Sequence, residues 1–214
     1  MKTEHLDLEE IYGIRSLSFS ESFSAFVERH SQKHERKVLD LCCGAGQRAL
    51  YMADLGLQVS ALDIDSRKLA ILHEKARDYR LNIEIFEASM TDLPFESGSF
   101  DTVICCSALH HQTVTGILKT ISEIRRVCKS EGQVFFDILS ISDASYAVGL
   151  EIEPGTKVGG REGEEDVPHH YCTREELEDF LRAFSHVQIE EKNYTYRFRD
   201  QMYSSILFEV TAQI

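Results

Sequence analysis

No uninterrupted apolar run in this 214-residue chain is long enough to cross a bilayer. The first residues, Met1 to Asp7, do not form a secretory signal peptide. We therefore expect a cytoplasmic protein without a membrane partner. The length is sufficient for one domain with a complete hydrophobic core.

Basic side chains are too few to balance the acidic ones. Lys and Arg together number 23, against 36 Asp and Glu, so the net charge is −13. This balance disfavours nucleic acid as a partner, because nucleic-acid binding needs cationic side chains against the phosphates. The simplest explanation of the negative charge is solubility.

The six cysteines include no C-x-x-C pair. Neither a zinc site nor a thioredoxin-like redox site is therefore indicated, and we expect no bound metal. Two vicinal pairs, Cys42-Cys43 and Cys105-Cys106, would make a poor disulfide framework. In a cytoplasmic protein we expect them to be reduced and to pack as small buried apolar side chains.

What the chain does contain is a strand, a glycine turn and a helix in close succession. Val38, Leu39 and Leu41 predict a buried parallel strand, which ends at the turn Gly44-Ala45-Gly46; residues 48–55 then predict a helix. Glycines allow backbone to approach a ligand, and a helix N-terminus offers unpaired N–H groups. The unit therefore predicts a nucleotide-type site.

An acid just before the turn separates two classes of cofactor. Gly44, Gly46 and Ala49 fit the dinucleotide pattern G-x-G-x-x-G/A, which by itself permits NAD(P). Asp40, however, would repel a pyrophosphate and suits a ligand that presents an ammonium or hydroxyl group. The stretch from Asp40 to Gly46 resembles the first motif of class I S-adenosylmethionine (SAM) methyltransferases, [D/E]-x-G-x-G-x-G.

This resemblance implies that Asp40, Cys42, Gly44 and Gly46 contact SAM. Cys42 stands where the family usually has its first glycine. Because cysteine tolerates positive φ poorly, we expect φ to stay negative there.

A second acid follows at the spacing of a ribose-binding residue. Asp63 ends the next predicted strand, 19 positions after Gly44. A carboxylate can accept hydrogen bonds from both ribose hydroxyls at once. We therefore assign Asp63, with its neighbour Ile64, to the cofactor site.

A second stretch, from Ala88 to Ile104, resembles the same family. It is similar to the methyltransferase pattern G-D-A-x-x-L-P-F-x-x-x-S-F-D-x-V. The acid that contacts adenine in the family falls at Ser89, whose hydroxyl can still bond the exocyclic amine. Met90 would offer its backbone N–H and side chain to the adenine ring. Asp92 is the alternative acid, or else a cap in the loop.

Ligands of open α/β sheets bind beyond the carboxyl ends of the strands. Cys105 and Leu109, at the end of the predicted strand 101–106, are therefore expected to line the methionine side of the cofactor pocket. His110 and His111 follow, similar to an L-H-H sequence in the family. This pair is usually structural, but a histidine here could be a general base, and we name His110 as a catalytic candidate.

A third stretch resembles the family's acceptor side. Residues 169–177 are similar to h-x-[YF]-x-T-x-[ED]-E-L, a segment that borders the acceptor site in small-molecule methyltransferases. His169, His170 and Tyr171 are therefore acceptor-site and catalytic candidates; alternatively they pack and cap the next helix. The preceding acidic run, residues 162–166, is explained either as a solvated face or as attraction for a cationic substrate.

The order of predicted elements indicates one α/β domain, residues 1–214. We expect a Rossmann-like, doubly wound, seven-stranded sheet, mostly parallel, with an antiparallel C-terminal hairpin. Its parts would be a helical cap or lid (1–36), the SAM-binding core (37–139), an acceptor-site loop with little regular structure (140–172), and a final helix and hairpin (173–214). In the cap, Ser18 to Glu21 is a plausible capping box and Tyr12 a candidate lid residue.

The leading hypothesis is a SAM-dependent methyltransferase, similar to the ubiquinone/menaquinone methyltransferase-like group. It would move a methyl group from SAM to the oxygen or nitrogen of a small molecule and release S-adenosylhomocysteine (SAH). Neither [D/N]-P-P-[Y/F] nor a Pro-Cys nucleophile is present, which argues against nucleobase acceptors. The alternatives are a tRNA-modifying methyltransferase, an NAD(P)-dependent oxidoreductase and a non-catalytic SAM- or SAH-binding module. The oligomeric state, monomer or homodimer, stays open.

Overall fold

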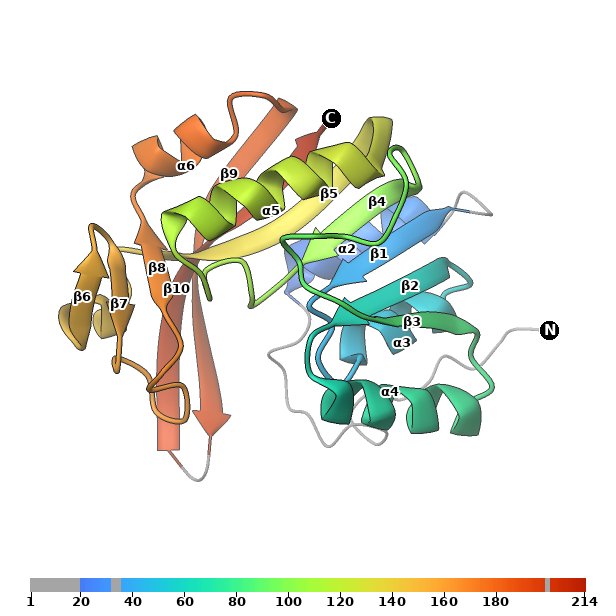
Figure 1. Cartoon of the computed structure of the whole chain (residues 1–214), viewed down its shortest axis with the longest axis horizontal. Helices are drawn as coiled ribbons and strands as arrows, with labels where there is room; N and C mark the ends of the chain where they lie inside the picture. Colours follow the sequence, from blue (N-terminus) through green and yellow to red (C-terminus); the bar gives the residue numbers. More distant parts are fainter. Residues whose placement is uncertain (1–19, 32–35, 199–200) are drawn as a thin grey trace.

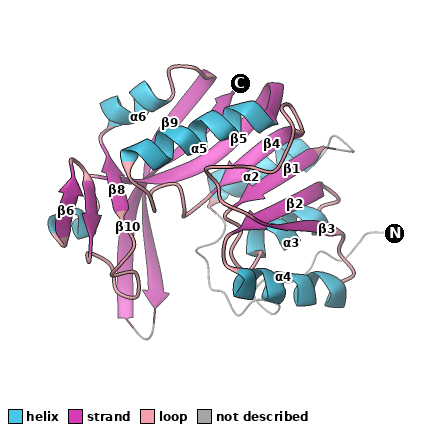
Figure 2. Ribbon diagram, in the orientation of Figure 1, coloured by secondary structure: helices cyan, strands magenta, loops and turns pink. Residues whose placement is uncertain are grey.

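The structure is a computed structural model that describes residues 20–31, 36–198 and 201–214. Figures 1 and 2 show a central twisted sheet with helices on both faces, and a long C-terminal hairpin at one side. None of the described helices is long and apolar enough to cross a membrane. Tyr12 and Ser18 lie outside the described residues, so the lid and the first capping residue stay predictions.

Seven strands form the sheet that the sequence predicted. Five are parallel, in the order β3-β2-β1-β4-β5, and the antiparallel pair β10 and β9 continues the sheet from β5. Their bounds are β1 Lys37–Leu41, β2 Gln58–Asp63, β3 Ile83–Glu87, β4 Phe100–Cys105, β5 Cys128–Ser140, β9 Ser185–Phe198 and β10 Gln201–Gln213. β5 follows α5 directly, because it begins at Cys128, one residue after the end of that helix. The doubly wound architecture is confirmed.

Helices cover both faces and bury one apolar stripe each. On one face lie α2 (Glu21–Ser31), α3 (Gln47–Asp54) and α4 (Ser66–Asp78), whose buried residues share one core cluster. On the other face α5 (Val114–Val127), with an apolar residue every three or four positions, and α6 (Arg174–Phe180) contribute to the second cluster. In Figure 1, α5 crosses in front of β4 and β5. Each side of the parallel sheet is therefore closed to water.

The segment 140–172 contains more regular structure than its glycines and prolines indicated. It forms the short 3₁₀ helix η1 (Ala144–Ala147) and strands β6 (Leu150–Glu153), β7 (Thr156–Val158) and β8 (His169–Cys172). β6, β7 and β8 pair antiparallel, and β8 joins the end of β5 in parallel, which brings the sheet to ten strands. The expectation of an irregular loop was wrong, because its glycines form the tight turns between these strands, as at Gly155 (φ 76°).

Helices α6 and α2 each begin with a hydroxyl side chain that caps the first turn. Thr173 caps α6, its Oγ1 accepting from the Glu176 N–H at 3.1 Å, the first bond of a capping box. At α2, the Oγ of Ser20 accepts from the Phe23 N–H at 3.0 Å. These caps fix where the chain leaves the sheet and enters a helix.

Candidate active site

The glycine turn after β1 adopts a backbone that only small residues fill. Gly44 and Gly46 have φ of 56° and 79°. A Cβ at Gly46 would lie 2.2 Å from Leu72 Cδ1, and Leu72 is completely buried. The turn therefore brings the start of α3 close against α4.

Cys42 corrects the expectation of a negative φ, because its φ is 60°. The reason is the way the turn is tied to the sheet: the Cys43 N–H donates to the Leu62 carbonyl of β2 at 3.0 Å. The thiol of Cys42 contacts Met90 Sδ at 3.4 Å. The cysteine thus accepts the left-handed backbone that the family's glycine would adopt freely, at a cost of about 1 kcal/mol.

Asp40 is buried at the carboxyl end of β1 with one oxygen unused. It is 2% exposed, and its Oδ2 has no hydrogen-bond partner among the described residues. Burial raises the pKa of Asp40 to about 7, although the nearby Arg48 guanidinium opposes the rise. An unpartnered buried carboxylate oxygen is costly unless a ligand completes it.

The carboxylate of Asp63, at the end of β2, accepts hydrogen bonds from the glycine turn after β1 and from the start of the loop before α4. Its Oδ2 accepts from the Gly44 N–H at 2.8 Å and its Oδ1 from the Asp65 N–H at 2.9 Å. A carboxylate has about four lone-pair sites, so capacity for further donors remains. The residue after it, Ile64, is 73% exposed, an apolar side chain beside the turn with nothing packed over it.

The other predicted cofactor residues divide into a loop group and a core group. Ser89 Oγ and Thr91 Oγ1 lie 2.9 Å apart, and the Asp92 N–H donates to the Ser89 carbonyl at 3.1 Å. Cys105 and Leu109, in contrast, are completely buried in the hydrophobic core. That these two line the cofactor pocket stays a prediction.

A cavity of about 830 Å³ lies beyond the carboxyl ends of β4 and β5. Of the predicted site residues, all within the described part of the chain, only His110 lines it. Its other walls come from α2, the start of α3, η1, the loop before β8, and the hairpin β9–β10. The charged and phenolic lining residues are Arg48, Asp137, Asp143, Arg161, Glu162, Glu164, Tyr194 and Glu209.

Unpartnered polar atoms concentrate around this cavity. Six buried side-chain atoms have no hydrogen-bond partner among the described residues. Four of them belong to cavity-lining residues: Arg48 Nε, His110 Nδ1, Arg161 Nε and Glu209 Oε2. Because buried polar groups in native proteins are almost always paired, these atoms mark a site for a polar ligand.

Two buried acids that line the cavity, Asp137 of β5 and Glu209 of β10, lie directly opposite each other in the paired strands. Burial raises the pKa of Asp137 to about 6, with Arg48 opposing and Glu209 adding to the rise. The Oδ1 of Asp137 accepts from the Ser107 N–H at 2.6 Å. Glu209 accepts from the Tyr194 hydroxyl at 2.5 Å. Burial together with Glu209 raises the pKa of Tyr194, so this phenol stays protonated.

Three histidines pack together at one side of the cavity. The ring of His110 lies 4.4 Å from that of His111 and 5.9 Å from that of His169, measured between centroids. Burial and the neighbouring imidazoles lower the pKa of His110 well below its usual value. His110 is therefore neutral and only a weak proton acceptor. His169 Nε2 lies 2.9 Å from Glu164 Oε2.

The last two acceptor-site candidates lie away from these rings. The Tyr171 hydroxyl bonds Ser145 Oγ at 2.8 Å, behind the cavity wall. His170 is completely buried, with Thr156 Oγ1 at 2.8 Å and Glu176 Oε2 at 3.3 Å. The structure thus brings His110 and His169 together, whereas the ring of His170 lies against Thr156 and Glu176; the catalytic roles of all three stay predictions.

The comparisons with known proteins match the cofactor side of the molecule. Residues 38–132 match the family model described as a methyltransferase domain. Residues 38–132 therefore form a methyltransferase domain, in agreement with the class I SAM-dependent family that the sequence motifs resemble. An uncharacterised methyltransferase of Synechocystis is 37% identical over 102 residues, 45% of this chain and 44% of the relative. A ubiquinone biosynthesis O-methyltransferase of Burkholderia vietnamiensis is 28% identical over 181 residues, 80% of this chain and 73% of the relative.

Solved structures extend the likeness of this chain over nearly the whole fold. A SAM-dependent methyltransferase of Methanosarcina mazei has a TM-score of 0.74 at 20% identity and covers 92% of this chain and 98% of its own. The Burkholderia thailandensis 1,6-didemethyltoxoflavin-N1-methyltransferase, with its acceptor and SAH bound, has a TM-score of 0.63 at 18% identity, with 89% and 75% covered. The chain spans about half the length of the first curated relatives it matches.

Sequence reasoning missed the two buried acids, Asp137 and Glu209, that line the cavity. Asp137 and Glu209 each interrupt an apolar strand pattern, Phe-Phe-Asp-Ile-Leu in β5 and Leu-Phe-Glu-Val in β10. A lone acid inside a buried strand was the available signal, since burying a charge without a purpose is unfavourable. Arg48 and Arg161 carried no such signal, because each lies in a stretch where an exposed arginine is ordinary.

Proposed function

We propose that the protein transfers a methyl group from SAM to a polar small molecule bound in the 830 Å³ cavity. The observation that carries this proposal is the concentration of four unpartnered buried polar atoms around that cavity. A volume of this order is typical of small-molecule sites, about 300–1,000 Å³. When bound, SAM supplies an electrophilic methyl group on a positively charged sulfur.

The residues of the glycine turn fit SAM. The free Oδ2 of Asp40 suits the ligand's ammonium group, and Asp63 retains lone pairs for the ribose hydroxyls. The exposed face of Ile64 and the side chain of Met90 offer apolar surfaces to the adenine ring. Ser89, with Asp92 as the alternative, would bond the exocyclic amine. These roles agree with the family's pattern and are part of the proposal.

The acceptor side supplies orientation and a dry environment. Asp137, Glu209 and Tyr194 form a buried polar floor that would bind hydroxyl or amine donors of the acceptor. Orientation of two reactants within a closed site can lower a barrier by several kcal/mol, about 7–11 in ideal cases. The nucleophile is an oxygen or a nitrogen of the acceptor. His110 lines the cavity and is neutral, and we propose it as a weak acceptor of the nucleophile's proton.

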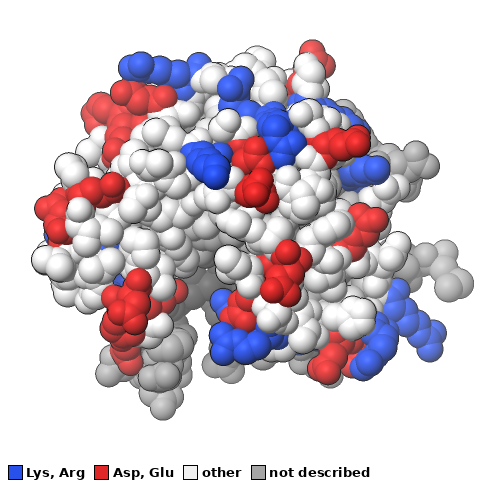
Figure 3. Space-filling model, viewed as in Figure 1, with Lys and Arg blue, Asp and Glu red and all other residues white. Residues whose placement is uncertain are grey.

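A small molecule is favoured over nucleic acid by the surface charge. On the face shown in Figure 3, the basic side chains of the described residues are dispersed among acidic ones. With a net charge of −13, this surface does not resemble one that attracts a phosphate backbone. We also propose a cytoplasmic location.

Calorimetric titration of the purified protein with SAH, with NAD as the control, tests the cofactor assignment. We expect SAH to bind and NAD to give no heat. Methyl-labelled SAM added with fractionated extracts then tests transfer and reveals the acceptor. Glu209→Gln should keep the affinity for SAH and lose transfer. SAH binding without any labelled acceptor would favour a non-catalytic SAH-binding module, and absence of SAH binding would overturn the proposal.

A further inference from the structure

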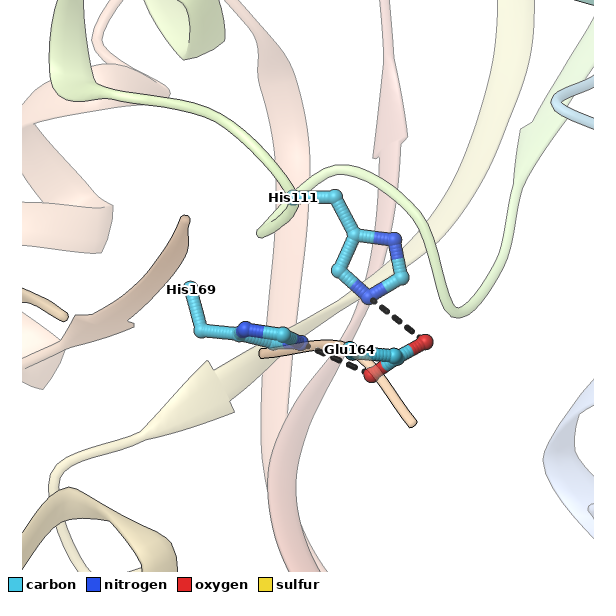
Figure 4. A group of neighbouring side chains, drawn as sticks. All are labelled: His111, Glu164 and His169. Carbon is cyan, nitrogen blue, oxygen red and sulfur yellow. Dashed lines mark hydrogen bonds and ion pairs between the residues drawn. The ribbon is translucent and has the colours of Figure 1, made fainter. Parts of the chain in front are cut away.

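Three side chains with metal-binding atoms meet on the wall of the cavity. His111 lies in the loop between β4 and α5, Glu164 in the loop between β7 and β8, and His169 is the first residue of β8. One ligand atom from each lies within 4.8 Å of the others. Figure 4 shows the two imidazole rings approaching the Glu164 carboxylate from different directions.

The distances fit a single ion between the three groups. His169 Nε2 lies 2.9 Å from Glu164 Oε2, and His111 Nε2 lies 3.9 Å from Glu164 Oε1. Ligand atoms about 2.1 Å from a tetrahedral Zn²⁺ are about 3.4 Å apart. The two observed separations, each to a different oxygen of Glu164, lie on either side of this value, and the ligand atoms of all three residues lie within 4.8 Å of one another.

The hydrogen bonds of His169 identify the nitrogen that would bind the ion. Its Nδ1 lies 3.0 Å from the Val167 carbonyl, which can only accept, so Nδ1 carries a proton. Its Nε2 then faces the Glu164 carboxylate, also an acceptor. This ring is only 1% exposed, and its Nε2 points at the carboxylate that would share the ion. A divalent cation bound at Nε2 would leave the Val167 bond in place, the usual arrangement of metal-binding histidines.

A second observation comes from His110. Its ring packs against both candidate ligand rings, it is 95% buried (5% exposed), and its Nδ1 has no hydrogen-bond partner among the described residues. A cluster of three imidazoles and one carboxylate is expensive to bury unless an ion or ligand completes it. His110 could serve as a further ligand or bond a ligand of the ion.

The group opens onto the cavity on one side. His111 and Glu164 line the cavity, whereas His169 lies behind them. The nearest fixed cation, Arg161, is paired with Asp143 at 3.3 Å and bonds Ser205 at 3.2 Å. Arg161 therefore does not prevent a cation from binding. A three-ligand site with a free position is the arrangement of catalytic zinc centres.

We propose that His111, Glu164 and His169 form a binding site for a divalent transition-metal ion, Zn²⁺ in the first place, whose open position takes an oxygen of the acceptor. The metal site is inferred from the three side chains alone. Only the identity of the oxygen-bearing ligand rests on the proposed function. An acceptor hydroxyl bound there loses its proton to solvent more readily, because the cation stabilises the resulting alkoxide or phenolate.

Direct metal binding tests the proposal without any methyl transfer. The purified full chain is freed of metal with a chelator and titrated calorimetrically with ZnCl₂, and Co²⁺ is added separately to record its visible d–d absorption. We expect one ion per chain and tetrahedral Co²⁺ bands. Glu164→Gln and His169→Ala should weaken Zn²⁺ binding by at least about 100-fold. Asp166→Asn, in the same acidic run, and His73→Ala, on the exposed side of α4, should leave it unchanged.

SAH titration of the same samples separates the two proposals. If SAH binds to every variant and Zn²⁺ binds to none, including the wild type, the metal site is wrong and the methyltransferase function stands. If Zn²⁺ binding is lost only in His170→Gln or Cys172→Ser, the ion occupies the other His/Cys/Glu group, with Glu176, and the proposal is also overturned. If Zn²⁺ binds to the wild type but SAH does not, the proposed function is contradicted and the metal site stands.

Discussion

The cofactor half and the acceptor half of this molecule are built in different ways. In the cofactor half, the decisive contact joins residues of one βαβ unit: the Gly44 N–H donates to Asp63, 19 positions away. In the acceptor half, the walls are tied by bonds between distant segments. Asp143 in η1 accepts from the Ile206 N–H of β10, 63 positions away, and Arg161 bonds Ser205, 44 positions away.

This difference explains why one half is recognisable and the other is not. The family model covers residues 38–132, which include the whole cofactor unit but neither the segment 140–172 nor the hairpin. A backbone cradle needs particular residue types at fixed spacing, and many acceptors can share it. The acceptor cavity needs only a matching set of polar groups, and these can come from any element that reaches it.

Among the substitutions considered, Gly46→Ala should reduce SAH affinity most, because it disturbs only the half of the molecule proposed to bind the cofactor. The new Cβ would meet three atoms of the buried Leu72 side chain within 2.8 Å, at a φ of 79°. Overpacking and backbone strain together cost about 3–4 kcal/mol. We expect SAH affinity measured by calorimetry to fall more than about 100-fold.

Gly56→Ala is the matched control for this substitution. Gly56 has a φ of 84°, but nothing lies within 4 Å of its added Cβ. The control therefore carries the backbone strain without the clash, and SAH affinity should stay within about twofold. Equal losses in both variants would contradict the assignment of Gly46 to the ligand cradle.

The converse experiment, Asp143→Ala, removes contacts that hold together the walls of the proposed acceptor cavity. Asp143 is 3% exposed and accepts from the Ser145 and Ile206 N–H groups, from Ser205 Oγ and from Arg161. Its removal leaves Arg161 without its ion-pair partner, and we expect a loss of about 3 kcal/mol, or about 6–12 °C in Tm.

Calorimetry on the Asp143→Ala variant should find SAH affinity within about twofold of the wild type, while transfer to the acceptor is lost. Asp166→Asn, an exposed acid of the same segment, should change neither quantity. If Asp143→Ala abolished SAH binding without unfolding, the two halves would not be independent, and the comparison would fail.

The charge of Asp40 should have a smaller effect on SAH affinity, seen as a dependence on pH. Burial raises its pKa to about 7, so the carboxylate gains a proton as the pH falls through neutrality and loses its attraction for the ligand's ammonium group. We expect SAH to bind about tenfold more weakly at pH 6 than at pH 8.

Asp40→Asn should bind SAH weakly and show no such pH dependence. The same raised pKa means that the contribution of Asp40 to stability is present at low pH and is lost as the pH rises through about 7. The difference in unfolding free energy between wild type and Asp40→Asn should therefore change in this window. A flat difference from pH 4 to pH 8 would contradict the raised pKa.

The smallest effect is expected at Cys42. At a φ of 60°, Cys42→Gly should be more stable than Cys42→Ala by about 1 kcal/mol, because both lose the thiol and only alanine keeps the strain. SAH affinity should differ by less than about threefold among the three proteins. Denaturant unfolding measures the stability, and a more stable alanine variant would show that the left-handed backbone is not strained.

Prediction from the sequence succeeded where local pattern and function coincide. The strand, turn and helix around Gly44 and the C-terminal hairpin follow from apolar periodicity and turn residues. It failed for the segment 140–172, where glycines signalled turns between short strands, and for φ at Cys42, which the pairing of the turn with β2 imposes. The cofactor roles of Asp40, Asp63 and Ser89 stay predictions until ligand binding is measured.

The sequence by itself determined the cofactor unit, because a backbone turn with positive φ and an acid at fixed distance leave a trace in residue type and spacing. Only the tertiary structure decided the acceptor cavity and the His111–Glu164–His169 group. Their polar atoms lie on segments that are far apart in the chain, and each residue has an ordinary explanation in its own segment. Their meaning appears only when folding brings them together, removes water from them and leaves several of them without a partner.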